Sequence, residues 1–254
     1  MIECVMGSSH AVSGAAGWLA GCAVLAAAGH PVAVPVIIVG AVVAAGSALV
    51  PDCDHPSSSV AHTFGPVSKW ACRRIGRMCA VLHARTRTAL DVRDLDGHRT
   101  LTHTVLFALV TGGLIALGGL LGGLVFAGVV MFATTGLAVR ALWPRRKRGA
   151  LGATLAGVLA AAALLTFAPT GGWWWLGVPV AFGCLAHIGG DMLTNTGVPA
   201  LFPLMLRGRR WLRLRAPRPL RFGTGGRAEH LVRWLMLAAG GVAAGWLLQV
   251  AAQM

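Results

Sequence analysis

The amino-acid sequence predicts an all-α fold, a polytopic membrane helix bundle of about seven transmembrane helices with one basic amphipathic helix at the membrane interface. Hydrophobic residues make up 56% of the chain and charged residues only 12%, whereas soluble domains carry about 25% charged residues. Apolar runs of about 20 residues, the length that crosses the hydrocarbon core, recur along the chain. Because these runs occupy most of the sequence, we treat residues 1–254 as a single integral-membrane domain.

The first two spans are predicted at residues 10–28 and 32–50, with a short turn between them. Small residues recur at helical spacing in the first span: Gly14, Gly17 and Gly21. Small residues at such spacing let two membrane helices approach closely, so they predict a packing face. Pro51 ends the second span because proline interrupts a helix.

Residues 51–102 form the longest polar stretch, and we expect a cytoplasmic insertion that contains an amphipathic helix. Apolar residues recur in it at spacings of three and four: Val67, Ala71, Ile75, Met78 and Leu82. Basic residues repeat every four positions on another face: Lys69, Arg73 and Arg77. Such a helix lies in the headgroup region and binds anionic lipids, with Trp70 as an anchor. We expect His62 and His83 to be exposed.

The apolar run from residue 103 to residue 140 is too long for one span. Glycine pairs at 118–119 and 122–123 predict a reversal, which divides the run into a third and a fourth span. Trp173, Trp174 and Trp175 are predicted to form an interfacial aromatic belt. The last three spans are expected at residues 150–167, from the tryptophans to about Gly190, and at 231–250.

The basic residues predict the orientation of the bundle. Segment 51–102 holds 8 Lys or Arg, segment 140–148 holds 5 and segment 207–233 holds 9, which together are all 22 in the chain. With seven spans these segments fall on one side, which the positive-inside rule makes cytoplasmic. The region 204–230 is therefore a cytoplasmic basic segment. We attribute the net charge of +14 to topology and anionic lipid, and do not expect nucleic acid as a partner.

Polar side chains gather at four of the predicted cytoplasmic helix ends: His10, Asp52 with Asp54, His98 to Thr104, and His187 with Asp191. Ionisable groups near the hydrocarbon are costly and mark functional sites. His187 and Asp191 are four apart, so they share a helix face. Asp52 and Asp54 are expected in extended chain, where alternate side chains point the same way. We expect these four ends to converge around metal.

Imidazole and carboxylate groups suit Zn²⁺, Mn²⁺ or Fe²⁺, and we expect one or two ions. The expected ligands are His10, Asp52, His103, His187 and Asp191. Asp54 or Asp191 would act as general base, and Arg99 would stabilise an oxyanion on phosphorus. Thr102, Thr194 and Asn195 would orient the ligands. Structural interpretations stay open: an interfacial histidine at His10, a helix cap at Asp52, and a buried hydrogen-bonded pair at His187 and Asp191.

Three motifs carry a resemblance to a known family: P-D-x-D-H at 51–55, H-R-T-x-T-H-T at 98–104, and H-x3-D-x2-T-x2-G-x4-F-P from His187 to Pro203. They look like those of the YdjM-like family of membrane-bound metal-dependent hydrolases, and the segment from Phe222 to Glu229 is also similar. The resemblance implies a multi-pass protein of the bacterial inner membrane with a divalent metal and hydrolase activity. Carried onto matching positions, it indicates His10, Asp52, His98, Arg99, His103, His187 and Asp191. We place His98 with Arg99 and Asp54 among the catalytic residues.

The expected function is therefore a metal-dependent hydrolase, with Zn²⁺ as the first candidate, acting on a phosphoester or lipid-linked substrate at the cytoplasmic face. A helical His-x3-acid pair is also similar to that of zinc-dependent phospholipase C, an analogy that favours a phosphoester. One alternative is a metal ion transporter, although transporters bind their cargo near the midplane of the bilayer. Another is a non-catalytic membrane protein whose metal only holds helices together.

Overall fold

The computed structural model describes residues 3–93, 96–143, 149–168 and 171–253, and within them it is all-α, without a β-strand. The described α-helices are α1 (Glu3–Ala27), α2 (Val34–Ser47), α3 (Pro66–Thr86), α4 (Val105–Leu142), α5 (Gly149–Phe167), α6 (Gly177–Met192) and α7 (Arg227–Ala252). Short 3-10 helices lie between them: η1 (Val50–Asp54), η2 (Val60–His62), η3 (Leu101–His103), η4 (Trp174–Leu176) and η5 (Arg218–Leu220). The predicted fold class is confirmed.

Five described helical segments are long and apolar enough to cross a membrane: α1, residues 34–54, α4, α5 and α7. α4 has 38 residues and is interrupted at Gly123, whose φ of +52° is not helical. The chain bends there, and the ring of Phe126 lies against Gly118. The bend falls in the predicted glycine-rich turn. The predicted count of seven spans thus rests on dividing α4 at Gly123 and on including α6, which has only 16 residues.

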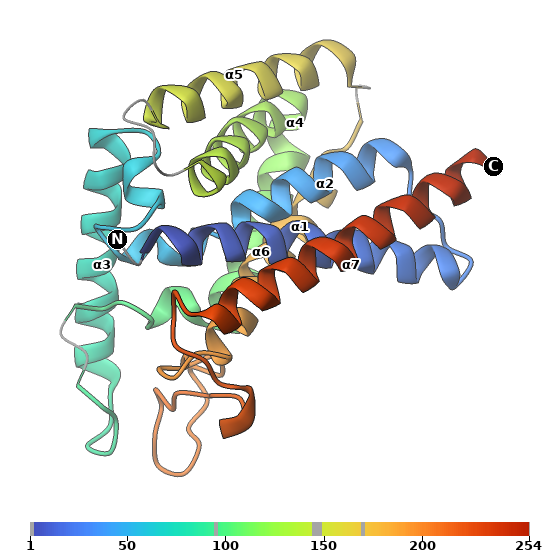
Figure 1. Cartoon of the computed structure of the whole chain (residues 1–254). Helices are drawn as coiled ribbons and strands as arrows, with labels where there is room; N and C mark the ends of the chain where they lie inside the picture. Colours follow the sequence, from blue (N-terminus) through green and yellow to red (C-terminus); the bar gives the residue numbers. More distant parts are fainter. Residues whose placement is uncertain (1–2, 94–95, 144–148, 169–170, 254) are drawn as a thin grey trace.

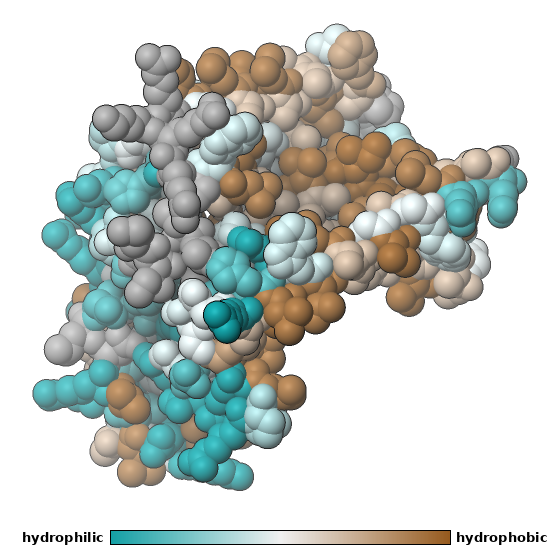
Figure 2. Space-filling view, viewed as in Figure 1, coloured by the Kyte–Doolittle hydropathy of each residue, from teal (hydrophilic) through white to brown (hydrophobic). Residues whose placement is uncertain are grey.

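The helices form a bundle with a polar end. α1 packs against α2, α6 and α7, while α3 runs across one end of the bundle (Figure 1). Hydrophilic residues gather at the α3 end and along the neighbouring loops, and hydrophobic residues cover the visible surface of the spans (Figure 2). This separation places α3 where a membrane interface would lie, because the apolar surface belongs in hydrocarbon.

Glycines bring α1, α2 and α6 into backbone contact. A Cβ on Gly14 would lie 2.9 Å from the Ala48 Cβ and would also meet the Ala44 carbonyl. Gly183 of α6 faces the same Ala44 carbonyl, at 2.5 Å from a Cβ built on it. Gly17 lies against the ring of Phe182, but Gly21 has no neighbour within 4 Å. The predicted packing face therefore holds for Gly14 and Gly17 and is wrong for Gly21.

α3 turns a different face to the protein from the one predicted. Its buried residues recur at helical spacing: Cys72, Gly76, Cys79 and His83. Val67 and Met78 of the predicted stripe are instead 73% and 71% exposed. The size of the side chains decides which face of α3 packs against the protein. Gly76 lies against the Asp54 carbonyl, where a Cβ would clash. Trp70 also points outward, with Arg74 over its ring.

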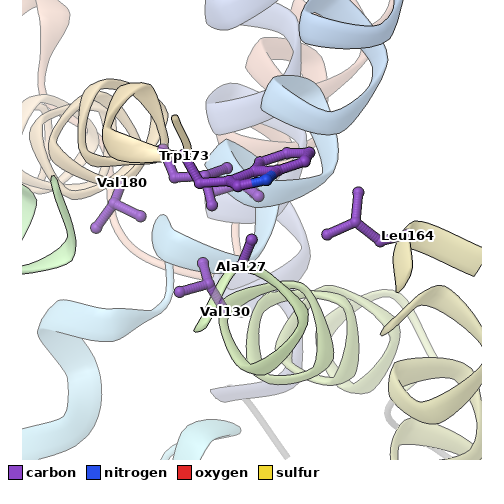
Figure 3. Close-up of a cluster of buried hydrophobic side chains, with 7 residues drawn as sticks. Ala127, Val130, Leu164, Trp173 and Val180 are labelled. Atoms are coloured by element: carbon purple, nitrogen blue, oxygen red, sulfur yellow. The ribbon is translucent and has the colours of Figure 1, made fainter. Parts of the chain in front are cut away.

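The predicted aromatic belt is only partly present. Trp174 is 56% exposed, but Trp173 is buried in an apolar cluster at the other end of the bundle. Figure 3 shows its indole over Ala127 and Val130 of α4, with Leu164 of α5 to one side. Trp173 is therefore a core residue, because the turn into η4 directs it between helices.

The basic segment after α6 is docked onto the end of α3. Trp211 is buried, stacks on Phe202 at 3.9 Å between ring centroids, and meets the ring of His83 at 5.1 Å. His83 is thus buried, contrary to the prediction. Burial would raise the pKa of Asp91, but N–H groups of Thr88, Trp211 and Arg210 donate to its carboxylate and lower that pKa.

We predict that Gly14→Ala lowers the free energy of unfolding by about 1–3 kcal/mol, because the added methyl overpacks the contact with α2. The matched change Gly21→Ala should be neutral or raise stability by about 0.5–1 kcal/mol, since it removes backbone entropy without a clash. Unfolding of the detergent-solubilised protein would measure both. Equal effects at the two positions would contradict the close approach of α1 and α2.

Candidate metal centre

Four separate segments bring the five predicted ligands together at the α3 end of the bundle. His10 comes from α1, Asp52 from η1, His103 from η3, and His187 with Asp191 from α6. Two groups have ligand atoms within 4.8 Å of one another: His10, His187 and Asp191, and Asp52, His103 and His187. Four of the five are buried and Asp52 is partly exposed. This His/Asp cluster could hold a metal ion.

The distances within the cluster are those of ligands that surround a common point. The Nε2 atoms of His103 and His187 are 3.1 Å apart. Asp52 Oδ1 lies 3.6 Å from the His103 Nε2 atom and 3.7 Å from the His187 Nε2 atom. Asp191 Oδ2 lies 3.5 Å and 3.6 Å from the same two atoms. The ring of His10 stacks on His187 with centroids 3.8 Å apart.

Hydrogen bonds orient both central histidines for ligation. His187 Nδ1 donates to the Ala48 carbonyl at 2.7 Å, which leaves its Nε2 lone pair facing the cluster. His103 Nδ1 lies 3.0 Å from Thr102 Oγ1 and 3.5 Å from Asp54 Oδ2, so we assign its Nδ1 as protonated too. A carbonyl or carboxylate behind the ring is the usual arrangement for a metal-binding histidine.

The charge of the cluster also suits a cation. Burial would lower the pKa of His103, but the carboxylates of Asp52 and Asp54, at 3.6 Å and 3.5 Å from its ring nitrogens, raise that pKa to about 10. The carboxylates that hold this proton would hold a divalent cation in its place.

Two buried polar atoms support the same conclusion. Within the described residues, His10 Nε2 and Asp191 Oδ2 make no hydrogen bond. His10 Nε2 lies 3.5 Å from Asp191 Oδ1, and Asp191 Oδ2 is in an ion pair with Arg99. Buried polar atoms are normally satisfied, and a metal would satisfy both. Imidazole nitrogens with carboxylate oxygens are the ligands that Zn²⁺, Mn²⁺ and Fe²⁺ accept. The residues present therefore fit a divalent metal.

Asp54 lies behind His103 rather than in the cluster. Its Oδ2 accepts from the Arg99 backbone N–H at 3.1 Å and from Thr102 Oγ1 at 2.5 Å. Its Oδ1 is 2.9 Å from His98 Nδ1. The carboxylate is buried and its oxygens are engaged, so it positions His103. His98 is 27% exposed and forms the solvent side of this network.

Arg99 joins the two halves of the site. Its φ of +56° is left-handed, a conformation that costs a non-glycine residue about 1–2 kcal/mol. In that conformation the backbone N–H reaches Asp54 while the guanidinium forks onto Asp191, with Nε 3.1 Å from Oδ2 and Nη2 3.1 Å from Oδ1. Nη1 donates to Thr194 Oγ1 at 3.1 Å. Arg99 therefore balances the charge of Asp191.

Some local expectations are corrected. Asp52 and Asp54 lie in the 3-10 helix η1, not in extended chain, and they face opposite nitrogens of the His103 ring. The tight turn after α2 produces this difference. Asn195 is exposed and not part of the cluster, whereas Thr102 contacts His103 and Thr194 donates to the Asp191 carbonyl.

Sequence reasoning assigned no role to Glu229, which is buried in the first turn of α7. It accepts from Ser9 Oγ at 2.7 Å and from the Gly225 N–H at 2.6 Å. These bonds tie α7 to α1 one residue before His10. The sequence signal that could have identified Glu229 is a lone carboxylate at the start of an apolar span, where an unpaired charge is costly.

A bundle of membrane-length helices with a buried histidine–aspartate cluster at one end defines the class of this molecule, an integral membrane protein with a candidate divalent-metal site. The chain belongs to the YdjM inner membrane protein family, whose model matches residues 5–252. No curated protein and no solved structure matches it.

We predict that Asp54→Asn lowers zinc affinity by about 10- to 100-fold, as expected when a group that orients a histidine ligand is lost. Asp96→Asn is a matched control, because Asp96 is exposed and accepts the His98 backbone N–H outside the cluster. Competition with a chromophoric chelator in detergent measures both affinities. Unchanged affinity in Asp54→Asn would refute the positioning role and favour Asp54 as a base.

Proposed function

We propose that this protein is a metal-dependent hydrolase of the inner membrane, acting on a phosphoester. One observation carries the proposal: the Nε2 atoms of His103 and His187 face each other at 3.1 Å, and a carboxylate oxygen from Asp52 and another from Asp191 flank them. Zn²⁺ is our first candidate for the cation, with Mn²⁺ and Fe²⁺ as alternatives. Such an ion would supply Lewis acidity, which would activate water at neutral pH.

We propose one ion rather than two. His187 belongs to both ligand groups, but its Nδ1 atom donates to the Ala48 carbonyl. A single remaining nitrogen cannot ligate two ions, so the two groups share one. His10, Asp52, His103 and Asp191 complete the ligand set.

The protein side chains then divide the proton chemistry. The Asp52 side chain is 22% exposed, while those of Asp54 and Asp191 are 0% and 1% exposed. Water reaches Asp52 first. Its Oδ1 atom faces the two histidines, so we assign to its other carboxylate oxygen the proton-accepting role that was expected of Asp54 or Asp191. We assign to His98, at the solvent side, the role of giving a proton to a leaving group. Arg99 holds Asp191 and adds positive charge beside a phosphoryl group.

The hydrophilic surface in Figure 2 gathers at the α3 end, and α3 carries basic residues of segment 51–102, so the positive-inside rule supports a cytoplasmic site. The transporter alternative is less well supported, since the cluster lies at an end of the bundle and not halfway along its spans. The second alternative is a metal that only holds helices together, and the experiment below distinguishes it from a catalytic metal.

Purified wild-type protein should contain about one equivalent of Zn²⁺. It should also hydrolyse bis(p-nitrophenyl) phosphate or p-nitrophenyl phosphate. His187→Ala should lose metal and turnover while staying folded, because it removes the central nitrogen. His62→Ala, at an exposed histidine, should keep both. Elemental analysis and a chromogenic assay provide the readouts. Unfolding of His187→Ala, with no turnover in the wild type, would support the structural metal instead.

We also propose that α3 lies on anionic headgroups, since Trp70, Arg73 and Arg77 are exposed together. Phosphatidylglycerol should raise the melting temperature of the detergent-solubilised protein more than phosphatidylcholine does. Arg73→Glu with Arg77→Glu should remove most of that difference, because each basic residue near an anionic surface contributes about 1 kcal/mol. High salt should weaken the effect in the wild type. Equal shifts with both lipids would contradict the proposal.

A further inference from the structure

A cavity of about 280 Å³ lies between α1, α6 and α7, beside the metal cluster. Its polar wall contains Ser9, His10, Ser13, Thr194, Glu229 and Arg233. Its apolar wall includes Gly17, Phe182, Ala186, Val232 and Met236. The cavity thus has two chemically different ends, as a site for an amphiphile requires.

The polar end is continuous with the metal cluster through His10. That ring lines the cavity and also stacks on His187. Its buried Nε2 atom lies 3.5 Å from Asp191 Oδ1, so this nitrogen faces the metal cluster. A ligand in the cavity would therefore contact the same residue that contributes to the ion.

The cavity extends along the helices into the region that hydrocarbon surrounds. On α1 its wall runs from His10 to Gly17, and on α7 from Glu229 to Met236. Seven residues of helix span about 10 Å. Met236 is 39% exposed on the outside of the bundle, among other exposed apolar residues of α7. The apolar part of the cavity therefore borders the surface that faces lipid.

Glycine leaves this space open. A Cβ at Gly189 of α6, which lines the cavity, would have no atom within 4 Å. Because Gly189 lines the cavity, a larger side chain at that position would occupy part of it.

Among the described residues, the polar end holds one cationic group, the Arg233 guanidinium, and it is this group that can bind an anion. The Nη1 atom of Arg233 donates to Ser8 Oγ at 3.1 Å, and its Nη2 atom lies 3.2 Å from His230 Nδ1. These two contacts use two of the five N–H donors of the guanidinium. Glu229 also lines this end, but its two carboxylate oxygens accept from Ser9 and Gly225. The guanidinium is thus the group that faces an incoming phosphate.

We infer that this cavity binds a hydrocarbon chain of a lipid phosphoester, with the phosphate between Arg233 and the metal cluster. The inference rests on the proposed hydrolase function and deepens it, because it assigns the substrate to membrane lipids that reach the site sideways from the bilayer. The apolar walls set the specificity for a chain, and Arg233 sets the specificity for an anionic headgroup.

A photoreactive lipid tests the cavity directly. The full-length protein is reconstituted in phosphatidylcholine vesicles with phosphatidic acid that carries a diazirine at the end of one acyl chain. Illumination should label the segments 13–17 of α1 and 232–236 of α7. Gly189→Leu should lower this labelling by about tenfold, the change that about 1.4 kcal/mol produces in an equilibrium constant. Gly241→Leu, another glycine with no atom within 4 Å of a Cβ, should leave it unchanged.

Metal content is measured in each variant, because Gly189 lies two residues from His187 and from Asp191. If Gly189→Leu loses metal, Val232→Phe fills the cavity from α7 and should lower labelling with the metal retained. Labelling that spreads over α4 and α5, or that neither variant lowers, is ordinary bilayer contact and overturns the inference. Specific labelling without turnover of any phosphoester would refute the hydrolase and keep the lipid site. Turnover of a soluble phosphoester without specific labelling would refute the lipid site and keep the hydrolase.

Discussion

The need to give two buried carboxylates hydrogen-bond donors is the constraint on which the rest of the structure depends. Asp54 and Asp191 are almost completely buried, and an uncompensated charge in such a place costs several kcal/mol. Thr102 and His98 donate to Asp54, while the Arg99 guanidinium forks onto Asp191. Arg99 also supplies its backbone N–H to Asp54, so the segment before α4 ties η1 to α6. The cluster forms where these partners meet.

Much of the fold and the assembly of the site could be predicted because their signals are local. The length of each apolar run identifies a membrane helix, and the gathering of basic residues in loops separates one end of the bundle from the other. His187 and Asp191 share a face because they are one helical turn apart. Polar residues at helix ends mark a common depth, so their convergence followed without knowledge of which helices are neighbours.

Features decided by contact with distant segments could not be predicted. α3 buries small residues around Gly76 because η1 approaches its backbone, although a hydrophobic pattern favoured another face. His83 is buried because Trp211 folds over it, more than a hundred residues later in the chain. Trp173 enters the core because α4 and α5 leave room for its indole. The role of Glu229 in joining α7 to α1 is visible only in the structure, where Ser9 donates to its carboxylate. Each case depends on a partner that no local pattern names.

The backbone contacts around Ala44 have a consequence for how an ion would be received. Gly14 and Gly183 bring α1 and α6 onto the same carbonyl of α2, so main-chain atoms rather than adjustable rotamers set the spacing of the three helices. His10 and His187 stand on two of these helices, and the third gives His187 its Ala48 partner. The framework is thus preorganised. A cation would meet a geometry already assembled, unlike the small zinc domains whose folding requires the metal.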